Sequence, residues 1–325
     1  MQGEYLNIFN NLFFDIESDE KVKLILEQSS AVLESLIIKF GEVQNELTYG
    51  IVKNDDFVDT VVILFIRKIM EQLDAINVLY SSCLFSPAEV LLRSLLENVV
   101  ELQFILKEDT KKRAAAYFLE HQYEEIEKAN RYFNGQTKNG KEMLNDIGSE
   151  KFQLYHEVCE KKRAALNRII KSNDVFKEID TARKKKIQSK KSNRIKHPHV
   201  QWYEVCSNVT NFHGMMNETG FGKYYDSLYN GLSLETHGLT AATAMHYDDD
   251  SFMLKWIRNP TDGGTTLSLA CSFSIRTLEK LYLYLGDGLD EQAEFKTFFI
   301  NFAQKRDIAV NNLDHVQNSS YRSNR

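Results

Sequence analysis

Residues 86–107 read SPAEVLLRSLLENVVELQFILK, and this stretch decides how the rest of the chain is interpreted. Its opening Ser-Pro-Ala-Glu is a helix start signal, because serine caps, proline fits the first turn and an acidic residue suits the positive end of the helix dipole. The remainder is apolar on almost every helical face, which predicts a buried helix. A charge in such a helix costs free energy unless it is paired. Arg93 and Glu97, four residues apart, are therefore expected in a buried network or in a site.

The composition favours an all-α fold. The chain has 325 residues, of which 43% are hydrophobic and 26% charged, as is usual for a soluble protein. Long helices exclude internal proline, and only three prolines occur in the whole chain. No apolar run reaches the roughly 18 residues of a membrane span, and the N-terminus lacks the pattern of a signal peptide. We therefore expect a cytoplasmic, all-helical protein without membrane contact.

Apolar periodicity predicts a single multi-helix bundle over residues 55–310. We expect residues 1–54 to flank it, residues 150–200 to project from it as a helical hairpin, and residues 311–325 to form a disordered tail. Residues 252–257 fit either a short strand or an extended segment. The helices expected from the pattern are 20–48, 55–82, 87–107, 110–133, 150–170 with an extension towards 187, 222–237, 265–285 and 289–309.

A second polar set lies in an apolar segment further along the chain. Tyr225, Tyr229, Ser233 and His237 are spaced by four residues, so they share one helical face. The Ser233 hydroxyl could orient the His237 imidazole. A histidine that moves protons and an arginine that holds phosphate are what metal-free RNA cleavage requires. The catalytic set predicted from both segments is Arg93, Glu97, Tyr229, Ser233 and His237. A purely structural network of the same side chains is an equally open alternative.

A basic segment, RKKKIQSKKSNRIK at residues 183–196, contains eight basic residues and no acidic one. The net charge of the chain is −6, so bulk charge does not make it a polyanion binder. Locally, such cations can grip phosphates, and the aromatic residues that follow can stack on bases. The predicted RNA-binding set is Lys184, Lys185, Lys186, Lys190, Lys191, Arg194, Lys196, Trp202 and Tyr203. The alternative is a solvated hairpin tip that binds nothing.

No cofactor or metal is expected from the motifs. The four cysteines are far apart and contain no CxxC pair, and no glycine-rich nucleotide-binding loop occurs. Residues 246–250, HYDDD, could offer metal ligands, but an acidic loop that ends a helix is the simpler interpretation. A helical set of carboxylates and histidine lacks the E-x2-H spacing of di-iron bundles. This set is Glu120, His121, Glu124 and Glu125.

The order of three motifs resembles DUF5677, a widespread prokaryotic family of helical proteins of unknown function. The motifs are LLRSLLE at 91–97, Trp202-Tyr203, and Y-x3-Y-x3-S-x3-H from Tyr225 to His237. The family carries an R-x3-E pair early and an S-x3-H pair late. A looser likeness is to HEPN-type helical ribonucleases of toxin and antiviral systems, which carry R-x4-H on one helix and act as dimers. Here the arginine and the histidine lie on different predicted helices, so this likeness is an analogy.

Two functions follow as expectations. The first is a metal-independent, ribonuclease-like effector of a bacterial toxin or antiviral defence system. Its substrate would be RNA, and it would act as a homodimer and with an antitoxin or defence partner protein. The second is a non-enzymatic helical sensor or binding module for a phosphorylated ligand or a protein partner.

Overall fold

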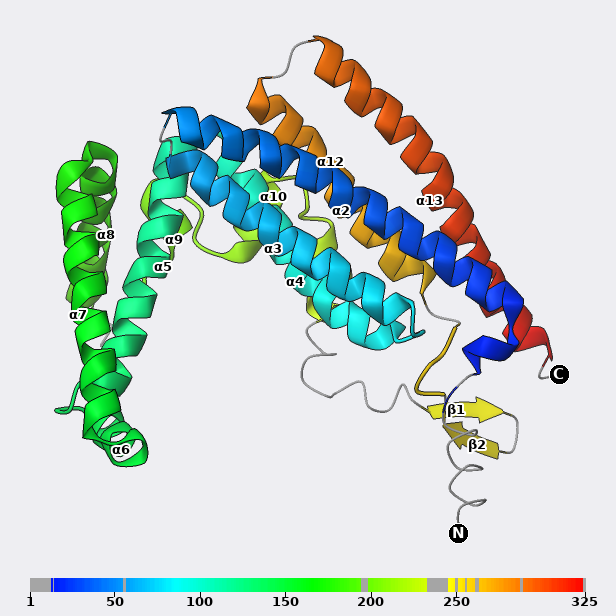
Figure 1. Ribbon diagram of the computed structural model, residues 1–325, viewed down its shortest axis with the longest axis horizontal. Helices are drawn as coiled ribbons and strands as arrows, with labels where there is room; N and C mark the ends of the chain where they lie inside the picture. Colours follow the sequence, from blue (N-terminus) through cyan, green and yellow to red (C-terminus); the bar gives the residue numbers. More distant parts are fainter. Residues whose placement is uncertain are drawn as a thin grey trace. The chain divides into compact units, whose positions relative to one another are not determined.

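The computed structural model of this chain describes residues 13, 15–54, 57–193, 198–232, 245–248, 251–254, 256–260, 263–286 and 289–323. The fold is all-α, as predicted (Figure 1). The chain divides into two compact units, which we call the first unit (residues 1–106 and 215–325) and the second unit (residues 107–214). None of the described helices is long and apolar enough to cross a membrane.

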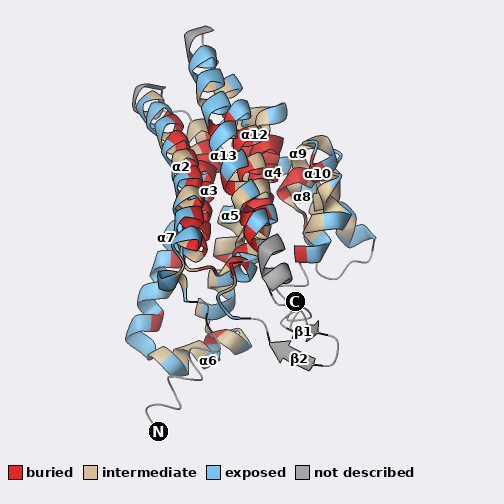
Figure 2. Ribbon diagram, turned by 90° about the vertical axis from the view of Figure 1, so that its right-hand side faces the viewer, coloured by how far each residue is buried: buried red, intermediate tan, exposed pale blue. Residues whose placement is uncertain are grey.

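Long helices build the first unit. They are α2 (Glu20–Asn54), α3 (Phe57–Tyr80), α4 (Phe85–Lys107), α12 (Gly264–Leu285) and α13 (Leu289–Ser323). Helix α2 packs against α3, α12 and α13, and Figure 1 shows these helices side by side. Figure 2 shows buried residues along α2, α3 and α12 in red. Fully buried side chains in this core include Leu36, Phe40, Phe65, Ile69, Leu73, Phe104 and Phe273.

Polar contacts join the helices of this core. The Gln72 side chain on α3 donates to Ser94 Oγ on α4. Helix α4 is tied in turn to α12, where the Gln103 Nε2 group donates to Thr277 Oγ1 at 3.0 Å. Because α4 is held on both sides, its remaining polar residues have a fixed position relative to the core. This is the helix that carries Arg93 and Glu97.

Shorter elements complete the first unit. They are η1 (Ile16–Ser18), the π-helical turn η2 (Tyr225–Tyr229), β1 (Met245–Asp248), β2 (Ser251–Leu254) and α10 (Phe212–Glu218), whose first three residues belong to the second unit. The strands form an antiparallel hairpin in which Met245 pairs with Leu254 and Asp248 with Ser251. The expected strand or extended segment at 252–257 thus begins one residue earlier, within β2.

The second unit is built on α5 (Thr110–Phe133). Around it lie α6 (Lys138–Ile147), α7 (Ser149–Ser172), α8 (Asp174–Ser192) and α9 (Trp202–Cys206). Helices α7, α8 and α9 all pack against α5. The predicted helical hairpin exists as α7 and α8, and its turn is at Asn173, whose side chain caps α8. The basic segment was expected at the tip of this hairpin, which is wrong, because its residues 183–192 form the last turns of α8.

Helix α13 is longer than expected. A disordered tail was predicted from residue 311, but the helix continues to Ser323. Leu313 and Val316 are buried, and the Asn312 side chain donates to Gln28 of α2 at 2.8 Å. Two apolar residues in a polar stretch are a weak sequence signal, yet both side chains are buried in the fold.

Candidate functional site

Arg93, Glu97 and Tyr229 form a closed triangle of hydrogen bonds in the first unit. Arg93 Nε donates to Glu97 Oε1 at 3.2 Å, and Arg93 Nη2 donates to the Tyr229 hydroxyl oxygen at 3.1 Å. The Tyr229 hydroxyl donates to the same Glu97 Oε1 at 3.0 Å. The guanidinium carbon also lies 4.5 Å from the centroid of the Tyr229 ring, within reach of a cation–π interaction. Three side chains from two distant segments are thus brought together.

A π-helical turn positions the tyrosine. Residues 222–237 were predicted as an ordinary α-helix, but Tyr225–Tyr229 is π-helical. The rings of Tyr225 and Tyr229 are stacked, with centroids 5.5 Å apart and an angle of 20° between their planes. Single π-helical turns are frequently found at functional sites. No signal in the sequence distinguishes this turn from an α-helical one.

The triangle is only partly buried. The side chain of Arg93 is 21% exposed and that of Glu97 is 37% exposed. Burial disfavours the charged guanidinium, but the hydrogen bonds that Arg93 donates to Tyr229 and Glu97 outweigh this effect and raise the pKa of Arg93. For Tyr229, burial is the largest influence and raises the pKa of the hydroxyl, while the hydrogen bond from Arg93 opposes it. At neutral pH the arginine is therefore charged and the tyrosine is protonated.

The guanidinium keeps donors for a ligand. Of its five N–H groups, two are used by Glu97 and Tyr229, and the other three have no hydrogen-bond partner among the described residues. A charged, rigid fork of donors at a partly exposed position is suited to binding a phosphate or carboxylate. Ser233 and His237 lie outside the described residues. Their meeting with Arg93 therefore stays a prediction.

Most of the described cations of the basic segment have partners within the second unit. Lys184 pairs with Asp180 at 2.6 Å. Lys186 donates to the main-chain oxygen of Glu204, and Lys190 binds the Glu204 carboxylate at 2.8 Å. These contacts hold α8 against α9. Lys185 and Lys191 are exposed, and Arg194 and Lys196 lie outside the described residues.

Trp202 and Tyr203 cannot stack on bases in this fold, which corrects the predicted RNA-binding set. Both side chains are buried in α9, with 5% and 8% of their surface exposed. The Trp202 ring packs edge-on against Tyr117 of α5, with centroids 5.6 Å apart.

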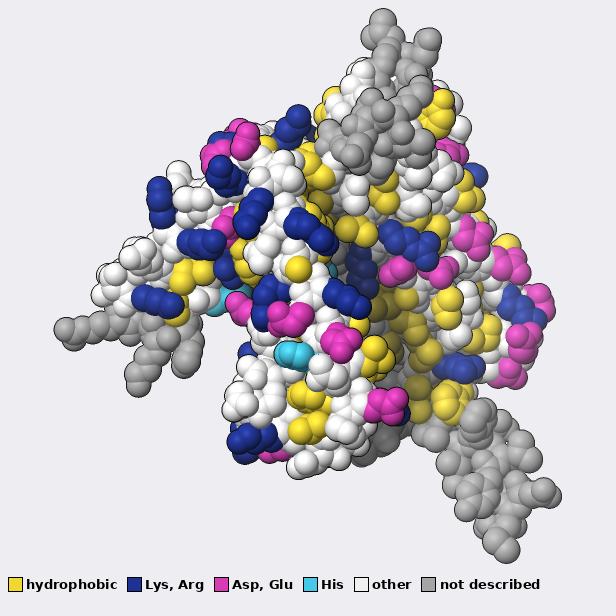
Figure 3. All heavy atoms as spheres, turned by 60° about the vertical axis from the view of Figure 1, so that its left-hand side comes forward, with side chains coloured by type: hydrophobic (Ala, Val, Ile, Leu, Met, Phe, Trp, Pro, Cys, Tyr) yellow, Lys and Arg dark blue, Asp and Glu magenta, His cyan; other side chains and the backbone are white. Residues whose placement is uncertain are grey.

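Figure 3 shows Lys and Arg side chains on the viewed face with Asp and Glu side chains between them. The sequence shows the aromatic residues and the cations, but it does not show the neighbouring side chains that pack against them or pair with them.

Another cluster, which the sequence analysis missed, joins α5 to the segment before α9. One potential ligand atom from each of Glu120, Glu124 and His199 lies within 4.8 Å of the others. Glu120 Oε1 is 3.5 Å from His199 Nε2, and Glu120 Oε2 accepts a hydrogen bond from the main-chain N–H of Trp202. Burial raises the pKa of Glu120 to about 7, against the opposing effect of the Trp202 N–H. The glutamates had been considered with His121, but the histidine that reaches them is His199.

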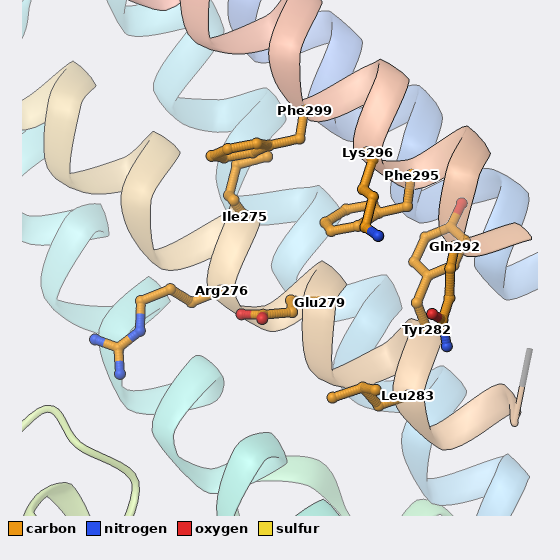
Figure 4. Close-up of a pocket in the computed structure, with 9 residues that line it drawn as sticks. All are labelled: Ile275, Arg276, Glu279, Tyr282, Leu283, Gln292, Phe295, Lys296 and Phe299. Carbon is orange, nitrogen blue, oxygen red and sulfur yellow. The ribbon is translucent and has the colours of Figure 1, made fainter. Parts of the chain in front are cut away.

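A cavity of about 440 Å³ lies between α12 and α13 (Figure 4). Its walls are mainly apolar and include Ile275, Phe295 and Phe299, with Glu279 and Lys296 among the polar lining residues. Arg93, Glu97 and Tyr229 do not line it. The cavity is thus separate from the hydrogen-bonded triangle.

The comparison with protein families identifies the chain. Residues 59–253 match the model of a family of unknown function, DUF5677. This match covers more than half of the chain, so the protein belongs to that family. The matched segment contains Arg93, Glu97 and Tyr229. None of the curated proteins and none of the solved structures is similar enough to match.

Proposed function

We propose that this member of the DUF5677 family binds a phosphorylated ligand at Arg93. The observation that carries the proposal is a charged guanidinium, held in place by Glu97 and Tyr229, with three donors left over at a partly exposed position. Fixing the fork in advance lowers the entropy that a ligand must lose on binding. The proposed class is a non-enzymatic sensor or binding module.

Each member of the triangle has a distinct role in this proposal. Arg93 donates to the phosphoryl oxygens, as guanidinium groups do in phosphate recognition. The Glu97 carboxylate repels phosphate but accepts hydrogen bonds, so it selects a ligand with a hydroxyl or amine beside the phosphoryl group. Nucleotides and RNA have this combination. The stacked rings of Tyr225 and Tyr229 offer an aromatic surface near the same place.

A second candidate is a metal-independent ribonuclease-like effector of a toxin or antiviral defence system. It is supported by the four-residue spacing that continues from Tyr229 to Ser233 and His237. In this proposal Arg93 holds the phosphate of RNA, Glu97 orients it, and His237 transfers protons. A homodimer, and an antitoxin or defence partner, belong to the same proposal.

Ligand binding is tested with the full-length protein. The probes are inorganic phosphate, AMP and a short fluorescent single-stranded RNA. We expect Arg93→Gln to weaken binding of AMP or RNA about tenfold or more, because a hydrogen bond to a charged group contributes about 1.5–3 kcal/mol. The matched control is Arg67→Gln, because Arg67 makes the same four-residue pair with Glu71 on an exposed face of α3. Equal binding by wild type and Arg93→Gln would refute the proposal.

Catalysis is tested separately in cells. The wild type and His237→Ala are expressed, and total RNA and growth are followed. A ribonuclease predicts RNA loss and growth arrest with the wild type and neither with the variant. Identical RNA profiles and growth would remove the enzyme and leave the binding module standing.

A further inference from the structure

We propose that Glu120, Glu124 and His199 form a binding site for a divalent transition metal ion of the Mn²⁺, Fe²⁺ or Zn²⁺ class. This site belongs to the second unit and is independent of the function proposed for Arg93. The two carboxylates lie one helical turn apart on α5, so both point to the same side. The imidazole comes from the segment before α9 and faces them, with its Nε2 atom 3.5 Å from Glu120 Oε1.

Glu120 and the main chain at His199 are already held by neighbouring groups, as in metal sites with an ordered outer shell. The main-chain N–H of Trp202 binds Glu120 Oε2 and leaves Oε1 directed at the histidine. The segment carrying the histidine is fixed by Lys190, which donates to His199 O at 2.8 Å and to the Glu204 side chain at 3.0 Å. The arrangement thus does not depend on the metal to bring its parts together.

The charge of the cluster is suited to a cation. Glu120 is 7% exposed, and a buried carboxylate is costly unless a positive charge or several hydrogen bonds compensate it. The positive charge of Arg183 acts on Glu120 through space. However, the Arg183 guanidinium lies 4.2 Å from the Tyr123 ring centroid and forms its ion pair with Glu127, at 3.9 Å. Lys128 is 3.8 Å from Glu124 and largely exposed. A divalent ion would neutralise both carboxylates at once.

The donor set selects the metal class. Two oxygens and one imidazole nitrogen suit Mn²⁺, Fe²⁺, Co²⁺ or Zn²⁺ better than Ca²⁺, which prefers oxygen alone. Ligand atoms at about 2.1 Å from such an ion lie about 3–3.5 Å apart. The spread of up to 4.8 Å therefore requires an inward movement of about 1 Å. Glu124 and His199 have exposed side chains that can make it, whereas Glu120 is fixed.

The ion would have two consequences within the second unit. It would join α5 to the segment that leads into α9, and so stabilise the packing of these elements. Three protein ligands also leave coordination positions open for water or a ligand, which is typical of catalytic rather than purely structural sites. The structural consequence is measurable without any assay of activity.

The test uses tag-free, full-length protein that has been stripped with a chelator. Co²⁺ binding is followed by its visible absorption, Zn²⁺ and Mn²⁺ binding by calorimetry, and thermal unfolding is recorded with and without metal. We expect one site per chain whose occupancy raises the unfolding temperature. Glu124→Gln and His199→Asn should each weaken metal binding at least about tenfold and abolish the metal-dependent shift.

The matched control is His121→Asn, which removes an exposed histidine next to Glu120 on the same helix. It should bind metal as the wild type does. Circular dichroism checks that each variant is folded, and both ligand substitutions change exposed side chains, so neither should unfold the protein. The proposal is overturned if the wild type binds no metal at millimolar concentration, or if Glu124→Gln and His199→Asn bind as tightly as His121→Asn.

Discussion

Removal of two neighbouring hydroxyls on α12 should change the stability of the protein to different extents. Thr277 and Ser274 are both fully buried. The Thr277 hydroxyl donates to Phe273 O at 2.8 Å and accepts from Gln103 Nε2 at 3.0 Å. The Ser274 hydroxyl has no hydrogen-bond partner among the described residues. The pair therefore separates the effect of a satisfied buried hydroxyl from that of an unsatisfied one.

The magnitudes follow from these contacts. Thr277→Val keeps the shape of the side chain but leaves the Gln103 amide, which is 5% exposed, without its acceptor. A buried donor left unpaired costs about 1–3 kcal/mol, so we expect the variant to lose about 2 kcal/mol. Ser274→Ala removes a buried polar group that makes no bond and leaves only a small space. Its stability should be unchanged within about 0.5 kcal/mol, or higher by up to about 1 kcal/mol.

Urea unfolding followed by circular dichroism gives the free energy of unfolding for both variants. Because the chain has two compact units, amide hydrogen exchange of α12 is measured as well, and it reports the stability of the first unit directly. The reasoning fails if Ser274→Ala loses as much stability as Thr277→Val. It also fails if Thr277→Val is neutral, because the Gln103 amide would then not depend on this acceptor.

Other substitutions test the core, the triangle and the thiols. Phe40→Ala removes a fully buried ring from α2 and should lower the free energy of unfolding by about 3–5 kcal/mol in the same urea assay. Tyr229→Phe keeps the ring but removes the hydroxyl shared by Arg93 and Glu97, so it should cost about 1 kcal/mol, and a double-mutant cycle with Glu97→Gln should show positive coupling. Burial raises the pKa of Cys206 to about 11, so its thiolate is scarce at pH 8. Native protein should thus react slowly with a disulfide reagent and faster as pH rises, whereas unfolded protein should release the signal of four free thiols at once.

Local patterns predicted the helices well and the contacts between them poorly. The start signal at Ser86 and the apolar face of residues 265–285 correspond closely to α4 and α12. The pairing of Arg93 with Glu97 is also present, because it needs only the spacing of one helix. The distant partner Tyr229 was placed in the same network, and the π-helical turn that presents it has no sequence signature.

The errors arose where a side chain's role depends on a neighbour from another element. Trp202 is an exposed stacking platform in the sequence pattern and a buried residue beside Tyr117 in the fold. The sequence pattern indicates that Lys190 is a free cation, but in the fold it forms an ion pair with Glu204 and donates a hydrogen bond to the His199 carbonyl oxygen. The Glu120 cluster was set aside for want of a histidine at the right spacing. Packing of the segment before α9 onto α5 supplies that histidine from elsewhere.

The residues matched by the family model do not coincide with the first unit, so binding experiments require the full-length protein. Residues 59–253 include Arg93 and Tyr229, and also the Glu120 cluster, but they exclude α2, α12 and α13. The excluded helices supply Phe40 and Phe273, both fully buried, and α12 supplies the partner of Gln103. A fragment cut to the matched residues would expose these apolar faces to water at a large cost in free energy. The site on α4 is therefore positioned by helices outside the matched segment, and loss of binding in such a fragment would report unfolding rather than the chemistry of Arg93.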